Sequence, residues 1–174
     1  MEFVEFIRKN RSRLVDEWFE WMIQHYPEPS RKYLLKREEA FTNPVGYNIF
    51  KNIEKLLQFI GNGEHLSSDF ENSIGEIIKI RSIQGLESWF ALNIFDFLWQ
   101  RYAENLDGKT EARDLLESIG YYHRLVSICV RKYVEIKEMI AEIQKNEMKN
   151  RYGKILERLN EKYLLIKDRN DDEL

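Results

Sequence analysis

The chain has 174 residues, and its 27 Lys and Arg against 30 Asp and Glu give a formal charge of -3. A chain of this length buries about 70% of its unfolded surface, which suffices for one core. The slightly acidic balance argues against a protein that coats nucleic acid or anionic lipid. With three prolines, eight glycines and 33% charged residues, the composition favours helices over short strands joined by turns.

Two features predict a cytoplasmic protein without membrane insertion. The amino terminus lacks the basic and apolar regions of a signal peptide. The most apolar stretch, 86–99, carries Glu87 and Asp96 and is too short to span a bilayer. The single cysteine, Cys129, lies in the apolar run 125–130, which predicts a buried free thiol.

Two helices are expected before residue 40. The first covers residues 2–26, where one stripe at helical spacing consists of Phe3, Ile7, Leu14, Trp18, Trp21 and His25. Pro27 and Pro29 end it, because residues before proline are pushed out of the helical conformation. Ser30 is then expected to cap a short basic helix that contains residues 33–35.

The third and fourth helices have clearer start signals. Asn43 is a good N-cap, and Pro44 at the first helical position loses no needed hydrogen bond. This helix is expected to end at the Gly-Asn-Gly sequence 61–63. Ser68 and Glu71 have the spacing of a capping box, which predicts a fourth helix ending at Gly85. The buried stripe of the fourth helix is expected to contain Phe70, Ile74, Ile77, Ile78 and Arg81.

The rest of the chain is expected to be helical as well. Residues 86–105 are apolar nearly all round, which predicts one central core helix, followed by a turn at 106–109. A long helix is expected from about Thr110, with its apolar stripe at Leu115, Ile119, Tyr122, Val126, Cys129, Tyr133, Ile136, Ile140 and Ile143.

The segment 131–174 is dense in charges of both signs and predicts an extension distinct from a helical domain at 1–130. Its apolar seam restarts at Tyr152, Ile155, Leu159, Tyr163 and Ile166. Two structures fit this pattern: a helix that docks on a partner, or an antiparallel hairpin with a break near 150–153. Residues 168–173 are expected to be frayed.

No pattern of catalytic chemistry is present in the sequence. It contains no glycine-rich phosphate loop, no nucleophile elbow, no Cys/His cluster and no pair of histidines at metal spacing. We therefore expect a protein that is not an enzyme and holds neither a metal nor a cofactor. His123 leaves one alternative open, because a haem-ligating histidine in a helical bundle has similar surroundings to an ordinary surface histidine.

Two charged residues interrupt apolar patterns. Arg81 lies on the apolar stripe of its helix, and Asp96 lies between two phenylalanines. A buried charge is costly unless it is paired, so one interpretation is that Arg81 and Asp96 pair with each other. The alternatives are that Arg81 extends to solvent and Asp96 is exposed, or that they form a switchable contact near a ligand pocket or dimer seam.

Three short motifs together resemble a known family. They are His25-Tyr26-Pro27, the Phe-Thr-Asn-Pro-Val-Gly sequence at 41–46, and Ile-Ile-Lys-Ile-Arg-Ser-Ile-Gln at 77–84. In order and spacing they resemble the amino-terminal domain of RsbRD-type RsbT co-antagonist proteins, over about residues 3–102. The third motif reads Ile-Arg-Ser-Ile-Gln where the family has Ile-Arg-Ala-Val-Gln.

The resemblance implies a globin-related sensor domain without haem, usually dimeric, that serves stress-response signal transduction. Such domains are joined to a STAS domain that works with a serine/threonine kinase. Here the sequence after Tyr102 is helical only, so the partner-switching role does not carry over. What carries over is the input half, a domain that senses a ligand or docks to a regulatory protein.

We therefore expect an all-α, globin-like bundle of about six to eight helices with a long C-terminal helical extension, acting as a homodimer. A ligand or partner would bias the packing of two long helices. Asn43, Pro44 and Gly46 are expected to form a cap, a rigid turn and a close helix approach. As an alternative, that helix N-terminus holds an anionic signal, with Arg81 and Gln84 as further candidates.

Two other functions remain open from the sequence. One is a haem- or small-ligand-binding globin-type sensor that uses His123. The other is an accessory subunit of a larger complex, whose charged extension docks on a partner.

Overall fold

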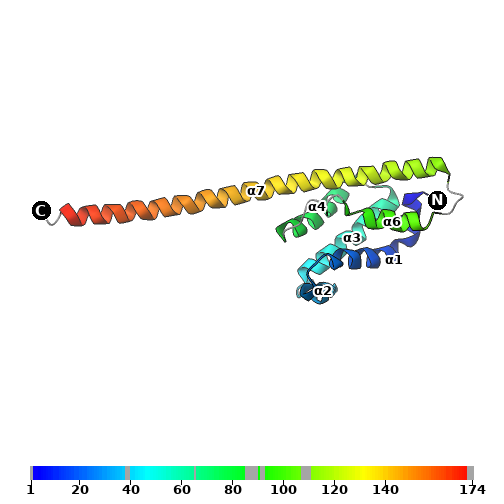
Figure 1. The fold of residues 1–174 in the computed structure, drawn as a ribbon, viewed down its shortest axis with the longest axis horizontal. Coiled ribbons are helices and arrows are strands. Elements are labelled where there is room, and N and C mark those ends of the chain that lie inside the picture. Colours follow the sequence, from blue (N-terminus) through cyan, green and yellow to red (C-terminus); the bar gives the residue numbers. More distant parts are fainter. Residues whose placement is uncertain are drawn as a thin grey trace. The chain divides into compact units, whose positions relative to one another are not determined.

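The computed structural model describes residues 2–37, 40–64, 66–84, 90, 93–106 and 111–171, with side chains up to Tyr163. In this part of the chain there are six helices and no strand (Figure 1). The prediction of an all-helical fold with a long C-terminal helix is confirmed. None of these helices has the length and apolar character that a membrane span needs. The chain divides into two compact units, Met1–Ile136 and Lys137–Leu174.

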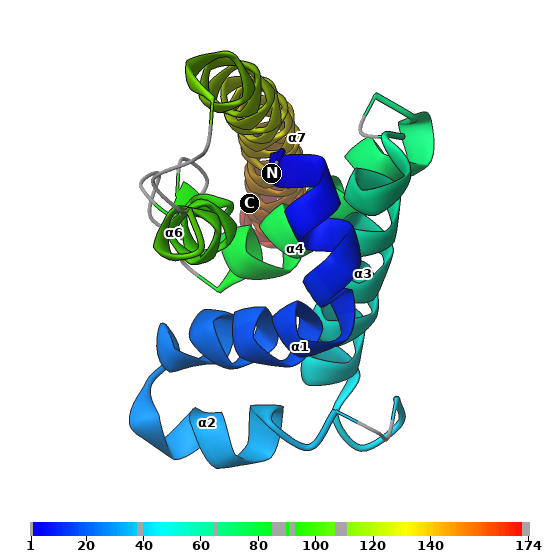
Figure 2. The same ribbon diagram turned by 90° about the vertical axis from the view of Figure 1, so that its right-hand side faces the viewer.

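The first unit is built around the packing of α1 (Phe3–Gln24) on α3 (Pro44–Asn62). The short α2 (Glu28–Leu34) contacts both of them, and α4 (Ser68–Ile83) packs on α3 (Figure 2). Helix α6 (Asp96–Glu104) packs on α1. The largest fully buried side chains are mostly aromatic, namely Trp18, Tyr102, Phe3, Phe6, Phe19, Phe70, Phe90 and Phe95. Burying each of these contributes about 1.5–3 kcal/mol, so they dominate the stability of the unit.

Two predicted helix starts are wrong by one to three residues. Helix α2 begins at Glu28 with Pro27 at the N-cap and no capping side chain, so Ser30 is not its cap. Proline at the second helical position explains this start, because proline favours the first turn. Helix α4 is capped by Ser67, whose Oγ accepts from the Phe70 N–H at 3.2 Å, and the predicted Ser68–Glu71 box does not form.

The predicted single helix over 86–105 is wrong where the structure describes it. Residues 94 and 95 form a turn, and α6 begins only at Asp96. The turn residues Ile94 and Phe95 and the α6 residues Phe97 and Leu98 are all buried. Asp96 therefore lies in the first turn of a helix, where a carboxylate is favoured by the helix dipole. Residues 85–89 and 107–110, which contain the predicted end of α4, the start of the core helix and most of the turn at 106–109, lie outside the described residues.

Helix α7 (Ala112–Asp171) begins near the predicted Thr110, but its buried face in the first unit differs from the predicted stripe. The buried positions are Ser118, Tyr121, Leu125, Ile128, Cys129 and Ile136. The Ser118 Oγ accepts from the Phe3 N–H at 3.1 Å and shares a 3.0 Å hydrogen bond with the Tyr102 hydroxyl. These bonds fix α7 against α1 and α6. The predicted burial of Cys129 is confirmed, and burial raises the pKa of its thiol.

The second unit consists of the later part of α7. The helix continues through residues 150–153 without a break, so the hairpin alternative is wrong. Gly153 is accommodated within the helix, and a Cβ there would meet nothing within 4 Å. The predicted fraying at 168–173 falls partly outside the described residues, and the helix itself extends to Asp171.

Candidate functional site

Asn43 joins the end of α2 to the start of α3. It is fully buried, and its Oδ1 accepts from the Gly46 N–H at 2.9 Å, which confirms the predicted N-cap. Its Nδ2 donates to the carbonyl oxygens of Tyr33, Leu34 and Lys36 at 3.0, 3.0 and 2.9 Å. One amide thus satisfies a helix N-terminus and the last carbonyls of the preceding helix.

Gly46 is required by this junction. A Cβ at Gly46 would lie 2.2 Å from the Leu34 carbonyl oxygen and 2.3 Å from the Asn43 Nδ2. Pro44 occupies the first helical position of α3, where its missing N–H costs nothing. The roles predicted for Asn43, Pro44 and Gly46 in the local structure therefore agree with the geometry.

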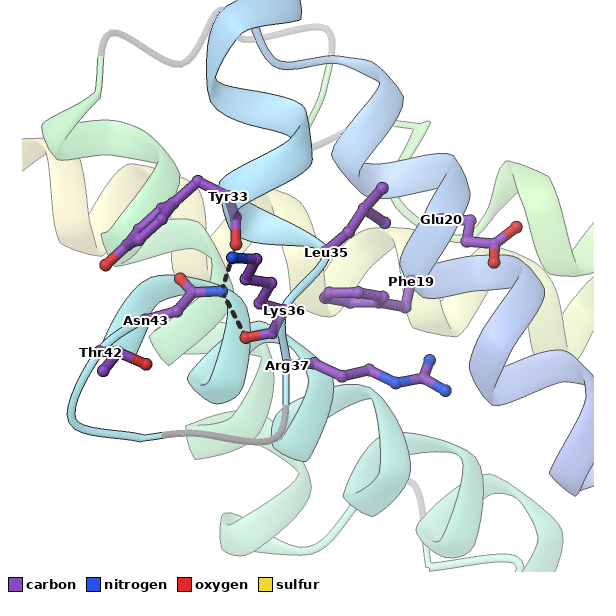
Figure 3. Close-up of a pocket in the computed structure, with 8 residues that line it drawn as sticks. All are labelled: Phe19, Glu20, Tyr33, Leu35, Lys36, Arg37, Thr42 and Asn43. Atoms are coloured by element: carbon purple, nitrogen blue, oxygen red, sulfur yellow. Dashed lines mark hydrogen bonds between the residues drawn. The ribbon is translucent and has the colours of Figure 1, made fainter.

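A pocket of about 720 Å³ opens beside Asn43 (Figure 3). Its walls come from α1, from the end of α2 and from the segment before α3; they are Phe19, Glu20, Tyr33, Leu35, Lys36, Arg37, Thr42 and Asn43. Its volume is in the range of small-molecule sites. The lining combines aromatic rings with charges of both signs, so it suits an organic molecule with an apolar body better than a simple anion.

Arg37 forms one wall of the pocket and is held in place on two sides. Its guanidinium lies 4.3 Å from the centre of the Phe50 ring and makes a 2.7 Å ion pair with Asp16. Because its charge is already paired, Arg37 contributes shape more than an open anion site. Sequence reasoning missed this residue, since no local pattern marks an arginine that stacks on rings from other helices.

Arg81 and Gln84 meet Tyr26 in a second cluster. The Arg81 guanidinium lies 4.1 Å from the centre of the Tyr26 ring and 4.8 Å from that of Phe90. The Tyr26 hydroxyl donates to the Gln84 Oε1 at 2.7 Å. Burial raises the pKa of Tyr26, and the neighbouring Arg81 opposes that rise. The Nε of Arg81 is buried, and no described residue forms a hydrogen bond with it.

Two predicted associations are not present in the described residues. Within the described part of the chain, no hydrogen bond or ion pair joins Arg81 or Gln84 to the Asn43 junction. The residues predicted to hold an anionic signal therefore form two separate groups, one at Asn43 and one at Arg81. Asp96 does not pair with Arg81; it accepts a short hydrogen bond from the Tyr122 hydroxyl. Burial, and then this bond, raise the pKa of Tyr122. The pairing interpretation was wrong because the Asp96 carboxylate is engaged by Tyr122 of α7 instead of Arg81.

His123 lies exposed on α7, beside Tyr122. A haem ligand has to reach an interior pocket, so this position gives the haem alternative no support. Among the described side chains there is no group of three His, Cys, Asp or Glu that could hold a metal ion.

The second unit carries an exposed apolar surface that we call the α7 seam. Every residue from 141 to 163 is exposed. The α7 seam consists of Met148, Tyr152, Ile155, Leu156, Leu159 and Tyr163, which are 51–69% exposed. An amphipathic helix normally buries its apolar face, so this surface has the character of an interface.

Comparisons with models of protein families, with curated proteins and with solved structures found no match to this chain.

Proposed function

We propose that this chain is a non-catalytic cytoplasmic regulatory domain that acts as a homodimer. In this proposal the first unit is a globin-like input domain of the kind that the RsbRD-type resemblance implies. The α7 seam is the dimerisation surface. The function is then to convert binding at the first unit into a change of pairing between two long helices.

The observation that carries the proposal is the exposure of the α7 seam. A helix gains most of its stability from packing its apolar face, and an isolated helix in water is only marginally stable. From residue 141 to 163 no side chain of α7 is buried, although Ile155 and Leu159 recur at helical spacing. A second α7 would supply the missing packing surface.

The motifs of the resemblance give a second line of support. Tyr26 belongs to the first motif, and Arg81 and Gln84 belong to the third; they lie in direct contact. Asn43 and Gly46 of the second motif build the α2–α3 junction. Residues that are 58 positions apart in the sequence thus serve one cluster, as expected if the motifs belong to one structural pattern.

Signal transfer in such a dimer requires that a ligand bind two arrangements with different affinity. A ligand of equal affinity for both arrangements would change nothing, however tightly it bound. The pocket beside Asn43 is positioned for such an effect, because its lining residues come from three separate segments. A ligand that drew these segments together would alter the packing of α1 and α3.

Light scattering of the full chain tests the dimer. We expect a dimer for the unaltered protein and a monomer for Leu159→Lys, because a charge in the α7 seam opposes its burial. The matched control is Asn150→Lys, which adds the same charge on the opposite side of the helix and should remain a dimer. A monomeric unaltered chain would contradict the proposal and favour the accessory-subunit alternative.

A second candidate, small-ligand sensing, is favoured by the pocket of about 720 Å³. Native mass spectrometry of gently purified protein should then detect a retained small molecule. The half-exposed Leu35 allows a control, because Leu35→Trp should fill the pocket without disturbing the core. Loss of the retained mass in that variant supports the candidate, and an equal mass in both proteins places the molecule elsewhere.

A further inference from the structure

The core positions of the α7 seam follow a regular pattern. Met148, Tyr152, Ile155 and Leu159 are separated by four, three and four residues, and Lys162 and Ile166 continue the spacing in the sequence. Alternating spacings of three and four are those of a two-stranded coiled coil. The series four, three, four, three, four is the same from either end, and its centre is Glu157. It therefore matches a second copy in parallel and in antiparallel orientation.

Lys162 distinguishes the two orientations. It occupies a core position of this pattern and is exposed. In a parallel pair in register, each Lys162 ammonium would face its own copy across the interface. Two like charges brought together and away from water repel each other, and no carboxylate occupies a core position to compensate.

The antiparallel orientation removes this conflict. With the pair centred on Glu157, Lys162 faces Tyr152 of the second copy, where an ammonium over an aromatic ring is attracted. Ile155 then faces Leu159 of the second copy, so the two central apolar side chains meet each other. Beside the core, Arg151 approaches Tyr163 of the second copy, which allows another cation–ring contact.

We propose that the α7 seam binds a second copy of this chain in antiparallel orientation, in the register centred on Glu157. This inference rests on the proposed homodimer and adds its direction and register. In this orientation the first unit of each copy is connected to the paired segment at the opposite end from the first unit of the other copy.

Disulfide cross-linking of the full chain tests the orientation. Tyr152→Cys and Lys162→Cys chains of different size are mixed, equilibrated and oxidised under mild conditions. In the antiparallel register the two cysteines face each other, so a cross-linked heterodimer is expected. Tyr152→Cys alone, which keeps Lys162, should give none, because its two cysteines then lie about 15 Å apart along the axis, beyond the about 7 Å that a disulfide spans.

Three controls separate the outcomes. The unaltered chain reports any disulfide from the buried Cys129. Lys154→Cys mixed with Lys162→Cys should not cross-link, because residue 154 lies on the side of the helix away from the α7 seam. The double variant Tyr152→Cys/Lys162→Leu lacks the Lys162 charge. It should therefore form disulfides with its own copies, because parallel pairs are then allowed.

Self-cross-linking of Tyr152→Cys in the otherwise unaltered chain would overturn the antiparallel orientation while leaving the dimer intact. A dimer that gives no cross-link with any of these cysteines would overturn the register. A monomer by light scattering would overturn the homodimer itself, together with the inference that rests on it.

Discussion

At the scale of single residues, Asn43 links two helices through its side-chain amide. Its amide makes four hydrogen bonds in a fully buried position: two to the last residues of α2, one to Lys36 just after that helix and one to the start of α3. Because the pocket borders this junction, any loosening at Asn43 would also change the shape of the pocket. The residue is thus a positioning element of the candidate site and has no spare N–H for a ligand.

Replacing Asn43 should destabilise the first unit. We expect Asn43→Ala to lower the free energy of unfolding by about 1–3 kcal/mol, because buried carbonyls lose their donor and α3 loses its cap. Asn43→Ser should lose less, since serine still accepts from the Gly46 N–H. Urea unfolding followed by circular dichroism measures both variants. Equal stability of all three proteins would contradict the hydrogen-bonding role.

Two glycines of α3 and α7 provide a matched pair. Gly46→Ala should destabilise the protein by more than about 1 kcal/mol, because its Cβ would lie 2.2 Å from the Leu34 carbonyl oxygen. Gly153→Ala should stabilise α7 by up to about 1 kcal/mol, because alanine favours a helix and meets no neighbour. Thermal unfolding compares the two. A harmless Gly46→Ala would show that α2 and α3 can separate at little cost.

At the scale of elements, polar contacts at Ser118, Tyr122 and Glu71 join α7 to the other helices of the first unit. Ser118 bonds to α1 and α6, and Tyr122 bonds to Asp96 at the start of α6. Glu71 of α4 pairs with Arg131 at 2.6 Å and with Lys132 at 3.6 Å, which lowers the pKa of Glu71, chiefly through the Arg131 bond. The two ion pairs of Glu71 are partly exposed and contribute little to the free energy of unfolding. Their main effect is on the orientation of α7.

Three buried or partly buried tyrosines predict a loss of stability in alkali. Burial raises the pKa of Tyr26, Tyr121 and Tyr122 in the folded protein. Above about pH 10 the unfolded chain therefore releases protons that the folded protein retains, and the free energy of unfolding falls as the pH rises. We expect Tyr122→Phe to reduce the steepness of this fall.

The pH dependence is measured by urea unfolding between pH 8 and 11. The half-exposed Tyr33 provides the control, because Tyr33→Phe removes a hydroxyl that the fold does not bury. If Tyr122→Phe and Tyr33→Phe gave the same profile as the unaltered protein, the Tyr122–Asp96 bond would not matter for folding.

At the scale of the whole molecule, dimerisation through the α7 seam predicts a stability that depends on concentration. A dimer that dissociates on unfolding is stabilised by mass action, so its melting temperature rises with protein concentration. We expect this rise for the full chain and for Asn150→Lys, and its absence in Leu159→Lys. A melting temperature independent of concentration in all three would argue against coupled association and unfolding.

Much of the helical architecture could be predicted because its signals are local. Asn43-Pro44 marks the start of α3, and Gly63, in the left-handed conformation at φ 77°, marks its end. These signals act through the backbone of one turn and need no distant partner. The predicted cap at Ser30 and the Ser68–Glu71 box failed for a related reason, since neighbouring residues, Pro27 and Ser67, competed for the same positions.

The candidate sites were only partly predictable. Arg81 and Gln84 were singled out from a pattern, but their contact with Tyr26 depends on how α4 lies beside the end of α1. The part played by Arg37 and Phe19 in the pocket has no local signal at all.

The sequence by itself determined the helical class, the N-cap at Asn43 and the burial of Cys129, because local hydrogen bonds and the spacing of apolar residues decide them. Only the tertiary structure decided that α6 begins at Asp96, that this carboxylate meets Tyr122 and that Ser118 faces α1 and α6. Those outcomes depend on which helices pack against each other. An apolar stripe in the sequence indicates that one face of a helix is buried, but it does not identify the helix that covers that face.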